Sequence, residues 1–227
     1  MNAYRRFVLK SLALSGLAGW SLGRPLGALA GTAVAPAAVA RPVLALVNPG
    51  AAESAFLQGA RAAGPRLRVQ RVGRDLDFLL DLERQLRGRP AMRVIGLLDD
   101  ASATLVVDLA RSAGARVQWL GQHSAQAGFT RHRVLNTDMA AGCARHLARQ
   151  LHRCGDGFSL SEERQGGTLA PRRLAGASRM GSRGGQWAAS LGYLLASLGA
   201  RTAIAAPLMP AANVPVAGSF VSFSIEV

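Results

Sequence analysis

The feature that most limits the fold of this chain is an alternation between short apolar runs and helical apolar stripes. Residues 43–47 and 94–98 are continuous apolar runs of strand length, and each is stopped by polar or turn residues. Between them, apolar side chains recur at helical spacing over 52–63 and 76–86. Strands that are apolar on both faces are typical of a parallel sheet with helices on both sides. The pattern therefore predicts an α/β fold.

The alternation continues as far as residue 154. Residues 67–72 alternate apolar and polar side chains, which is typical of a half-exposed edge strand. Further strands are expected over 117–120 and 131–135, and further helices before Gly114 and after Asp138. Together these elements predict a three-layer, Rossmann-like, mostly parallel sheet as the domain core over 41–154.

Beyond residue 154 the sequence predicts a loop, a helix and a last strand. Residues 155–185 are rich in glycine and arginine, and we expect a long mobile loop there. A leucine stripe over 187–198 predicts a helix, and alternation over 220–225 predicts a strand at an edge of the sheet. Residues 186–227 are thus expected to complete the same domain.

The pattern from 42 to about 154 resembles one lobe of the type I periplasmic-binding-protein and sugar-repressor fold. The segments that carry the likeness are 43–48, 94–99, 105–114 with 117–120, and 136–147. A flavodoxin-like fold fits the same periodicity. Proteins of the resembled type have two lobes, and a second full lobe is not expected in this chain, so the resemblance does not imply a hinged clamp.

Residues 1–30 have the three parts of an export leader. Arg5 and Arg6 form a basic region, an apolar stretch follows over 7–23, and the small-residue triplet 28–30 marks a cleavage site. The segment that begins at Arg5 and Arg6 resembles the twin-arginine (Tat) leader of bacteria. That resemblance implies export of the folded protein by the Tat machinery to the periplasm, with 31–40 as a linker.

The leader leaves alternatives open. An ordinary secretory leader and a retained N-terminal anchor are the alternatives to a Tat leader, and cleavage after Ala35 or Ala40 is an alternative to cleavage after Ala30. The apolar stretch is shorter than the roughly 20 apolar residues that a stable span needs. We therefore expect no stable membrane span after cleavage.

Candidate ligand-binding residues follow from the predicted sheet, because ligands bind beyond the carboxyl ends of strands in open α/β sheets. Adjacent carboxylates at a strand end can hold a hard cation or a hydroxylated ligand, and a histidine there can move protons. The alternative is that the two aspartates cap the next helix and that the histidine lies in a loop. The residues selected are Asn48, Asp99, Asp100, Gln122, His123, Ser124, Asn136 and Asp138.

Arginines concentrate in the second half of the chain, where residues 131–185 hold ten arginines and four acids. Arginines of the expected loop can grip an anion or an acidic protein partner. A solvated loop is the alternative. Nucleic-acid binding is not expected, because no aromatic side chain is interleaved with the basic residues between 159 and 186. The loop arginines selected are Arg172, Arg173, Arg179 and Arg183.

The two cysteines, Cys143 and Cys154, are expected on one helix. A continuous helix would separate them by about 16 Å, which is too far for a disulfide or a shared metal. If the helix ends before Cys154 and the chain folds back, either becomes feasible; otherwise both are buried thiols. The sequence contains no GxSxG or Walker A motif and no GxGxxG after the first expected strand.

These observations predict an exported, non-catalytic α/β protein that binds a small ligand or a partner protein and serves an envelope or redox system. The alternative is a periplasmic enzyme that uses Asp99, Asp100 and His123 at the strand ends, with metal assistance left open. The sequence identifies no metal site and no particular cofactor.

Overall fold

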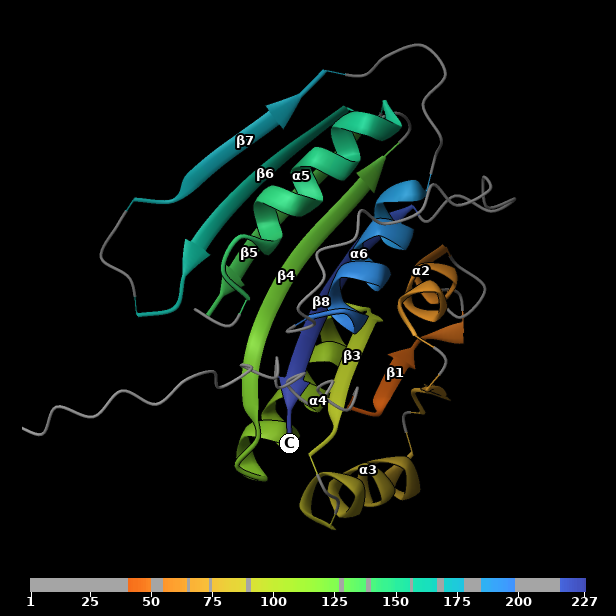
Figure 1. The fold of residues 1–227 in the computed structure, drawn as a ribbon. Helices are drawn as coiled ribbons and strands as arrows, with labels where there is room; N and C mark the ends of the chain where they lie inside the picture. Colours follow the sequence, from red (N-terminus) through yellow and green to blue (C-terminus); the bar gives the residue numbers. More distant parts are fainter. Residues whose placement is uncertain are drawn as a thin grey trace, which may run out of the picture. The chain divides into compact units, whose positions relative to one another are not determined.

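The computed structural model shows one mixed sheet with helices on both faces (Figure 1). The described residues all lie in one compact unit, Val39–Val227. They are 41–49, 55–64, 66–73, 75–88, 91–126, 129–137, 140–155, 157–166, 170–177, 185–198 and 217–227.

Five helices and eight strands make up the described part of the chain. The strands are β1 Val43–Val47, β2 Leu67–Arg71, β3 Arg93–Leu98, β4 Arg116–Gln126, β5 Phe129–Asn136, β6 Gly157–Arg164, β7 Arg172–Gly176 and β8 Gly218–Glu226. The helices are α2 Ala55–Ala63, α3 Leu76–Gly88, α4 Asp100–Ser112, α5 Cys143–Cys154 and α6 Gln186–Ala196.

The strand order is β2-β1-β3-β8-β4-β5-β6-β7. Strands β2, β1 and β3 are parallel, whereas β8 is antiparallel to both of its neighbours, β3 and β4. β4 consequently runs in the same direction as β3. β5 is antiparallel to β4, β6 is parallel to β5, and β7 is antiparallel to β6.

The α/β class is confirmed, whereas the mostly parallel, Rossmann-like arrangement is not, because the sheet is mixed and four of its seven strand pairs are antiparallel. The difference arises at the β4–β5 pair, in the segment 155–185, and at β8, which is antiparallel to both of its neighbours. Gln126 at the end of β4 pairs with Phe129 at the start of β5, so β5 is antiparallel to β4 and no helical crossover joins them. The segment 155–185, expected as a loop, contains β6 and β7, which pair with each other in register.

The position of β8 also differs from the prediction. It was expected at an edge of the sheet, but it lies in the middle, between β3 and β4. Its sequence places Val221, Phe223 and Ile225 on one face and Ser222 and Ser224 on the other, and all five are buried. Because the two serines alternate with apolar residues, the sequence pattern is that of an edge strand with one solvent-exposed face. In the structure both serines are buried in the core.

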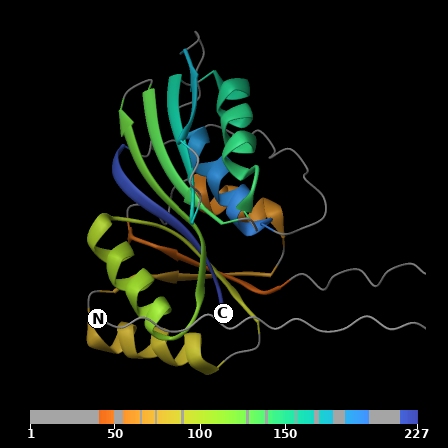
Figure 2. The same cartoon turned by 90° about the vertical axis from the view of Figure 1, so that its left-hand side faces the viewer.

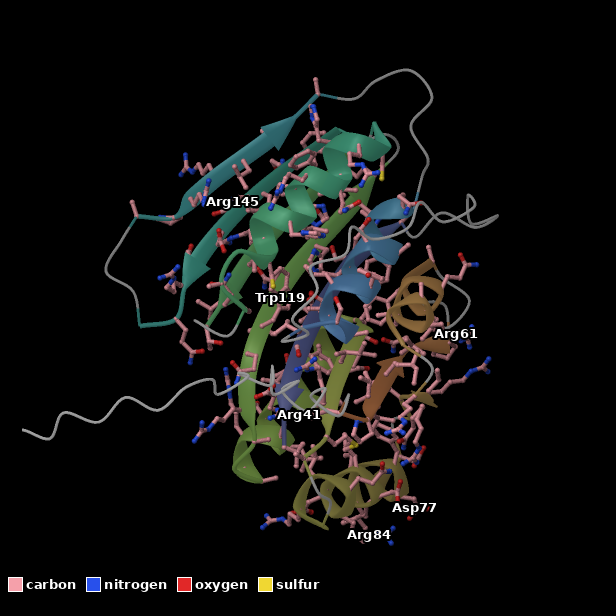
Figure 3. All side chains as sticks on the ribbon, viewed as in Figure 1. Arg41, Arg61, Asp77, Arg84, Trp119 and Arg145 are labelled. Carbon is pink, nitrogen blue, oxygen red and sulfur yellow. The ribbon has the colours of Figure 1, made fainter. Side chains whose placement is uncertain are left out.

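Helices cover the two faces of the sheet unequally (Figure 2). On one face, α2, α5 and α6 pack over a core that includes Ile95, Trp119 and Trp187. On the other face, α3 and α4 pack over a core that includes Leu46, Val94 and Phe223. Figure 3 labels Trp119, which lies on β4 and is fully buried.

Two glycines permit close packing at the centre of the molecule. A Cβ atom on Gly96 of β3 would lie 2.2 Å from the ring of Phe223, so the aromatic ring of β8 occupies the space that a larger residue would need. On α2, a Cβ on Gly59 would lie 1.8 Å from the carbonyl oxygen of Ala189 on α6. Glycine at these positions lets β8 and α6 approach their neighbours.

We predict that Gly96→Ala lowers the free energy of unfolding by about 2 kcal/mol, because the added methyl group overpacks against Phe223. Urea unfolding at neutral pH measures the change. Gly88→Ala is the matched control, since nothing lies within 4 Å of that Cβ, and it should leave stability within about 1 kcal/mol. Adding Phe223→Leu should recover part of the loss, and equal effects of Gly96→Ala and Gly88→Ala would contradict the close contact.

Candidate anion-binding face of the sheet

One half of the sheet has a face that no described helix covers. It belongs to β4, β5, β6 and β7, on the side where α3 and α4 pack over the other half (Figure 2). Because side chains alternate along a strand, the residues of this face are every second one. They include Arg131, Arg133 and Arg173, all three of which are exposed. We call this surface the open face.

The strand register arranges the open face in rows that cross the sheet. One row contains Gln122 of β4, Arg133 of β5, Ser161 of β6 and Arg173 of β7, each directly opposite the next. The row beside it contains Ser124, Arg131, Ser159 and Ala175. On this face β5 carries two arginines and the neighbouring strand β6 carries two serines, so each arginine of β5 lies beside a serine of β6.

One pocket of the open face is lined by Arg131, Arg133 and Arg173 together with Ser159, Ser161 and the carboxylate of Glu163. Strand geometry places the Cα atoms of Arg131 and Arg133 about 7 Å apart along β5. It places the Cα atom of Arg173, two strands away, about 10 Å from that of Arg133. Within the part of the chain that the structure describes, no carboxylate forms an ion pair with any of the three. Uncompensated guanidinium groups beside hydroxyls are suited to bind phosphate or carboxylate.

Three pockets lie on or beside the open face, and Arg133 lines each of them. The central pocket, of about 250 Å³, lies between Arg131, Arg133, Gln122 and Ser124. A second pocket of about 510 Å³ lies over β6 and β7 and includes Arg173. A third of about 360 Å³, the α4 groove, lies between α4 and the sheet. Arg133 is therefore the side chain common to the whole site.

Four of the sequence-selected residues come together at the central pocket. Asp100, Gln122, His123 and Ser124 all line it. The strand register brings Asp100 near Gln122. Val221 of β8 lies opposite both Gln122 of β4 and Leu98, which ends β3 two residues before Asp100. The segment 121–124 is part of β4 rather than the loop that was expected to follow a strand.

Asn48 and Asp99 also meet, but as a structural link. The Asn48 side-chain amide donates to Asp99 Oδ2 at 2.7 Å, and its oxygen accepts from the Asp99 backbone amide at 2.9 Å. Asp99 is the N-cap of α4 and accepts from the backbone amide of Ser102 at 2.8 Å. This pair ties the end of β1 to the start of α4.

The remaining selected residues are dispersed. Asn136 lies near the far end of β5, where its amide donates to Glu162 at 2.6 Å. Arg172 and Arg173 lie in strand β7 rather than in a loop. Asp138, Arg179, Arg183 and the leader residues Arg5 and Arg6 lie outside the described residues.

His123 is a buried residue, which differs from the loop histidine considered as an alternative. It is 3% exposed, and its Nδ1 lies 2.8 Å from Nδ1 of His132, which is 1% exposed. His123 Nε2 lies 2.7 Å from the hydroxyl of Ser222, and His132 Nε2 lies 2.9 Å from that of Thr130. Both rings pack against Trp187, with centroids 5.5 and 5.6 Å away.

The histidine pair is neutral in the folded protein. Burial, together with the neighbouring His132, holds the pKa of His123 well below its ordinary value of 6.5, and burial lowers the pKa of His132 to about 4. A hydrogen bond between two Nδ1 atoms requires one to carry the proton and the other to accept it, so the two imidazoles hold opposite tautomers. Trp119 donates its indole N–H to Ser222 at 2.9 Å and extends the network.

The cysteines lie at the two ends of one continuous helix, α5, and no disulfide joins them. Burial raises the pKa of Cys143 to about 11, with Glu162 adding to the shift, so its thiolate is not accessible at neutral pH. Because α5 is continuous from Cys143 to Cys154, the two residues are about 16 Å apart along its axis, which is too far for a disulfide or a shared metal.

Sequence reasoning missed the arginines of β5 and the serines of β6. A usable signal was present in the sequence: residues 158–161 alternate apolar and polar side chains, which is typical of a strand with one exposed face, and the arginines at 131 and 133 are two positions apart. Residues 158–161 were instead assigned to a loop, because the glycines and arginines that follow dominated the composition of the segment.

Comparisons with known proteins found no matching family model, no curated protein and no solved structure similar to this chain. Within the described ranges, no cluster of three or more His, Cys, Asp or Glu side chains is placed to hold a metal ion. None of the described helices is both long enough and apolar enough to cross a membrane.

We predict that the buried histidine pair makes the fold sensitive to acid. Because their folded pKa values lie below 6.5, the neutral pair contributes its full stability above pH 6.5 and loses it as the pH falls toward 4. His132 alone should account for roughly 2 kcal/mol between pH 7 and pH 5, where the unfolded chain binds the proton and the folded chain does not. Urea unfolding at pH 7 and at pH 5 measures the difference.

Two variants assign this acid sensitivity to the pair. His132→Gln should flatten the pH dependence of stability between 7 and 5, whereas His152→Gln, at an exposed position of α5, should retain it. If the wild type and His132→Gln lose the same stability between these pH values, the pair is not the source.

Proposed function

We propose that this chain is a non-catalytic binding protein whose open face holds a small ligand with a phosphate or carboxylate group. The observation that carries the proposal is one pocket lined by three arginines, Arg131, Arg133 and Arg173, together with two serines. Among the described residues none of these arginines is neutralised by an ion pair. Hydrogen bonds to a charged group are stronger than neutral ones, and an anion here would receive several at once.

A small ligand fits the surface better than an acidic protein partner. The arginines line concave pockets of about 250 and 510 Å³ rather than a flat or protruding patch. Their exposed guanidinium groups also leave the site open to solvent, so binding should weaken as salt screens the charges. An acidic protein would need its carboxylates to project into these pockets.

The site of action belongs to the same proposal. The Tat-like leader supports export of the folded protein to the periplasm, where a binding protein can serve an envelope or redox system. The resemblance to one lobe of a type I binding protein is supported by the β2-β1-β3 order, which is the start of the flavodoxin-like order 2-1-3-4-5. The antiparallel strands β8 and β5 depart from that pattern.

The catalytic alternative has less geometric support. Asp99 is engaged as the N-cap of α4, and the His123 ring is bonded to Ser222 and His132 in the interior. General acid–base catalysis needs a titratable group within hydrogen-bond reach of a bound substrate. We therefore assign ligand binding rather than chemistry to this edge.

We predict that Arg133→Ala weakens the binding of inorganic pyrophosphate at least tenfold, because it removes the guanidinium group common to all three pockets. Isothermal titration calorimetry at low ionic strength measures the dissociation constant. Binding by the wild type should also weaken as sodium chloride is added.

The matched control is Arg153→Ala. Arg153 is exposed near the end of α5, which packs on the opposite face of the sheet, and its removal lowers the net charge by the same amount. It should change the dissociation constant less than twofold. Equal effects of the two variants would show that pyrophosphate responds to net charge alone, and the assignment to the open face would be withdrawn.

A further inference from the structure

The α4 groove adjoins the arginines but has a different lining. One side of α4 contributes Ala103 and Val107, both buried, and the sheet contributes Leu120, Leu135 and Val221. The floor of the groove is therefore apolar. The side chains of Leu120 and Leu135 are only half-buried, so a ligand could remove more of their surface from water.

The groove and the central pocket adjoin each other. Asp100, Gln122 and Arg133 line both of them. A molecule with its charged group beside Arg133 can therefore extend toward the space between α4 and β5.

The rim of the groove disfavours a second anionic group. It carries Asp100, Asp108 and Glu163, and its one basic residue beyond Arg133 is Arg111. Arg111 already pairs with Asp108 at 3.7 Å. The carboxylates of Asp100 and Glu163 would repel a negative charge held over the apolar floor.

We propose that the ligand is a soluble amphipathic anion, with its phosphate or carboxylate head at the open-face arginines and an uncharged apolar chain in the α4 groove. This inference rests on the proposed function, since the head group uses the arginine cluster. Charge complementarity selects the orientation. In the central pocket Arg131 and Arg133 outnumber the one carboxylate, Asp100, whereas the groove is lined by three carboxylates and two arginines. Each fully buried methylene should tighten binding about fourfold.

The test compares inorganic phosphate, butyl phosphate, octyl phosphate and octanol by calorimetry, all below their aggregation concentrations. Wild-type protein should bind octyl phosphate at least tenfold more tightly than inorganic phosphate, with butyl phosphate between them. Leu135→Gln should reduce this gain by several-fold, because it places an amide on the floor. Leu105→Gln is the matched control at a leucine of α4 that is 54% exposed and does not line the groove. Thermal melting confirms that each variant is folded.

The outcomes separate the two proposals. If phosphate binds and chain length has no effect, or if Leu135→Gln and Leu105→Gln behave alike, the groove is not the chain site and the proposed function stands. If octanol binds as tightly as octyl phosphate, the arginines do not hold the head group. That result would overturn both the anion site and the amphipathic ligand. If no phosphate binds, both are overturned. Binding to phosphatidylglycerol vesicles in preference to every soluble phosphate would replace the soluble ligand with a membrane surface.

Discussion

The pairing of β8 between β3 and β4 is the constraint on which the rest of the structure depends. Without it, the parallel strands β2-β1-β3 and the strands from β4 onward would be two separate sheets. β8 pairs with β3 and with β4 through antiparallel hydrogen bonds. Its side chains over 221–225 are buried under the helices on both faces of the sheet. At its end, Glu226 accepts from Arg93 of β3 at 3.1 Å and pairs with Arg41 at the same distance. β8 thus joins the sheet formed by β1, β2 and β3 to β4 and the strands that follow β4 in the strand order.

The central position of β8 also determines which small residues the sheet needs. Phe223 lies over Gly96 of β3, and Ser222 faces Gly121 of β4, where an added Cβ would lie 2.8 Å from both the serine hydroxyl and the His123 ring. Ser222 in turn accepts from Trp119 and contacts His123. A polar network in the core persists because each of its ring nitrogens has a partner.

Strands and helices whose pattern is local could be predicted from sequence, and the pairing of distant strands could not. The runs at 43–47 and 94–98 appear as β1 and β3, and the alternating run at 67–72 appears as the edge strand β2. The direction of β5 and the place of β8 depend on contacts between residues up to 133 positions apart, which no periodicity records. Similarly, the strand-end rule brought Asp100, Gln122, His123 and Ser124 to one pocket, although it missed Arg131 and Arg133 because it considers only strand ends.

The β4–β5 pair joins the core and the candidate site through the two-residue period of a strand. On β5, Thr130 and His132 point into the histidine network, while Arg131 and Arg133 point out to the open face. The same register that places His132 directly opposite His123 places Arg133 opposite Gln122 and Arg131 opposite Ser124. A slip of β5 by one residue would bury Arg131 and Arg133 and expose His132, at the cost of desolvating two charges. The buried imidazoles therefore fix the register that holds the guanidinium groups at their spacing, so an anion would meet arginines that the core has already positioned.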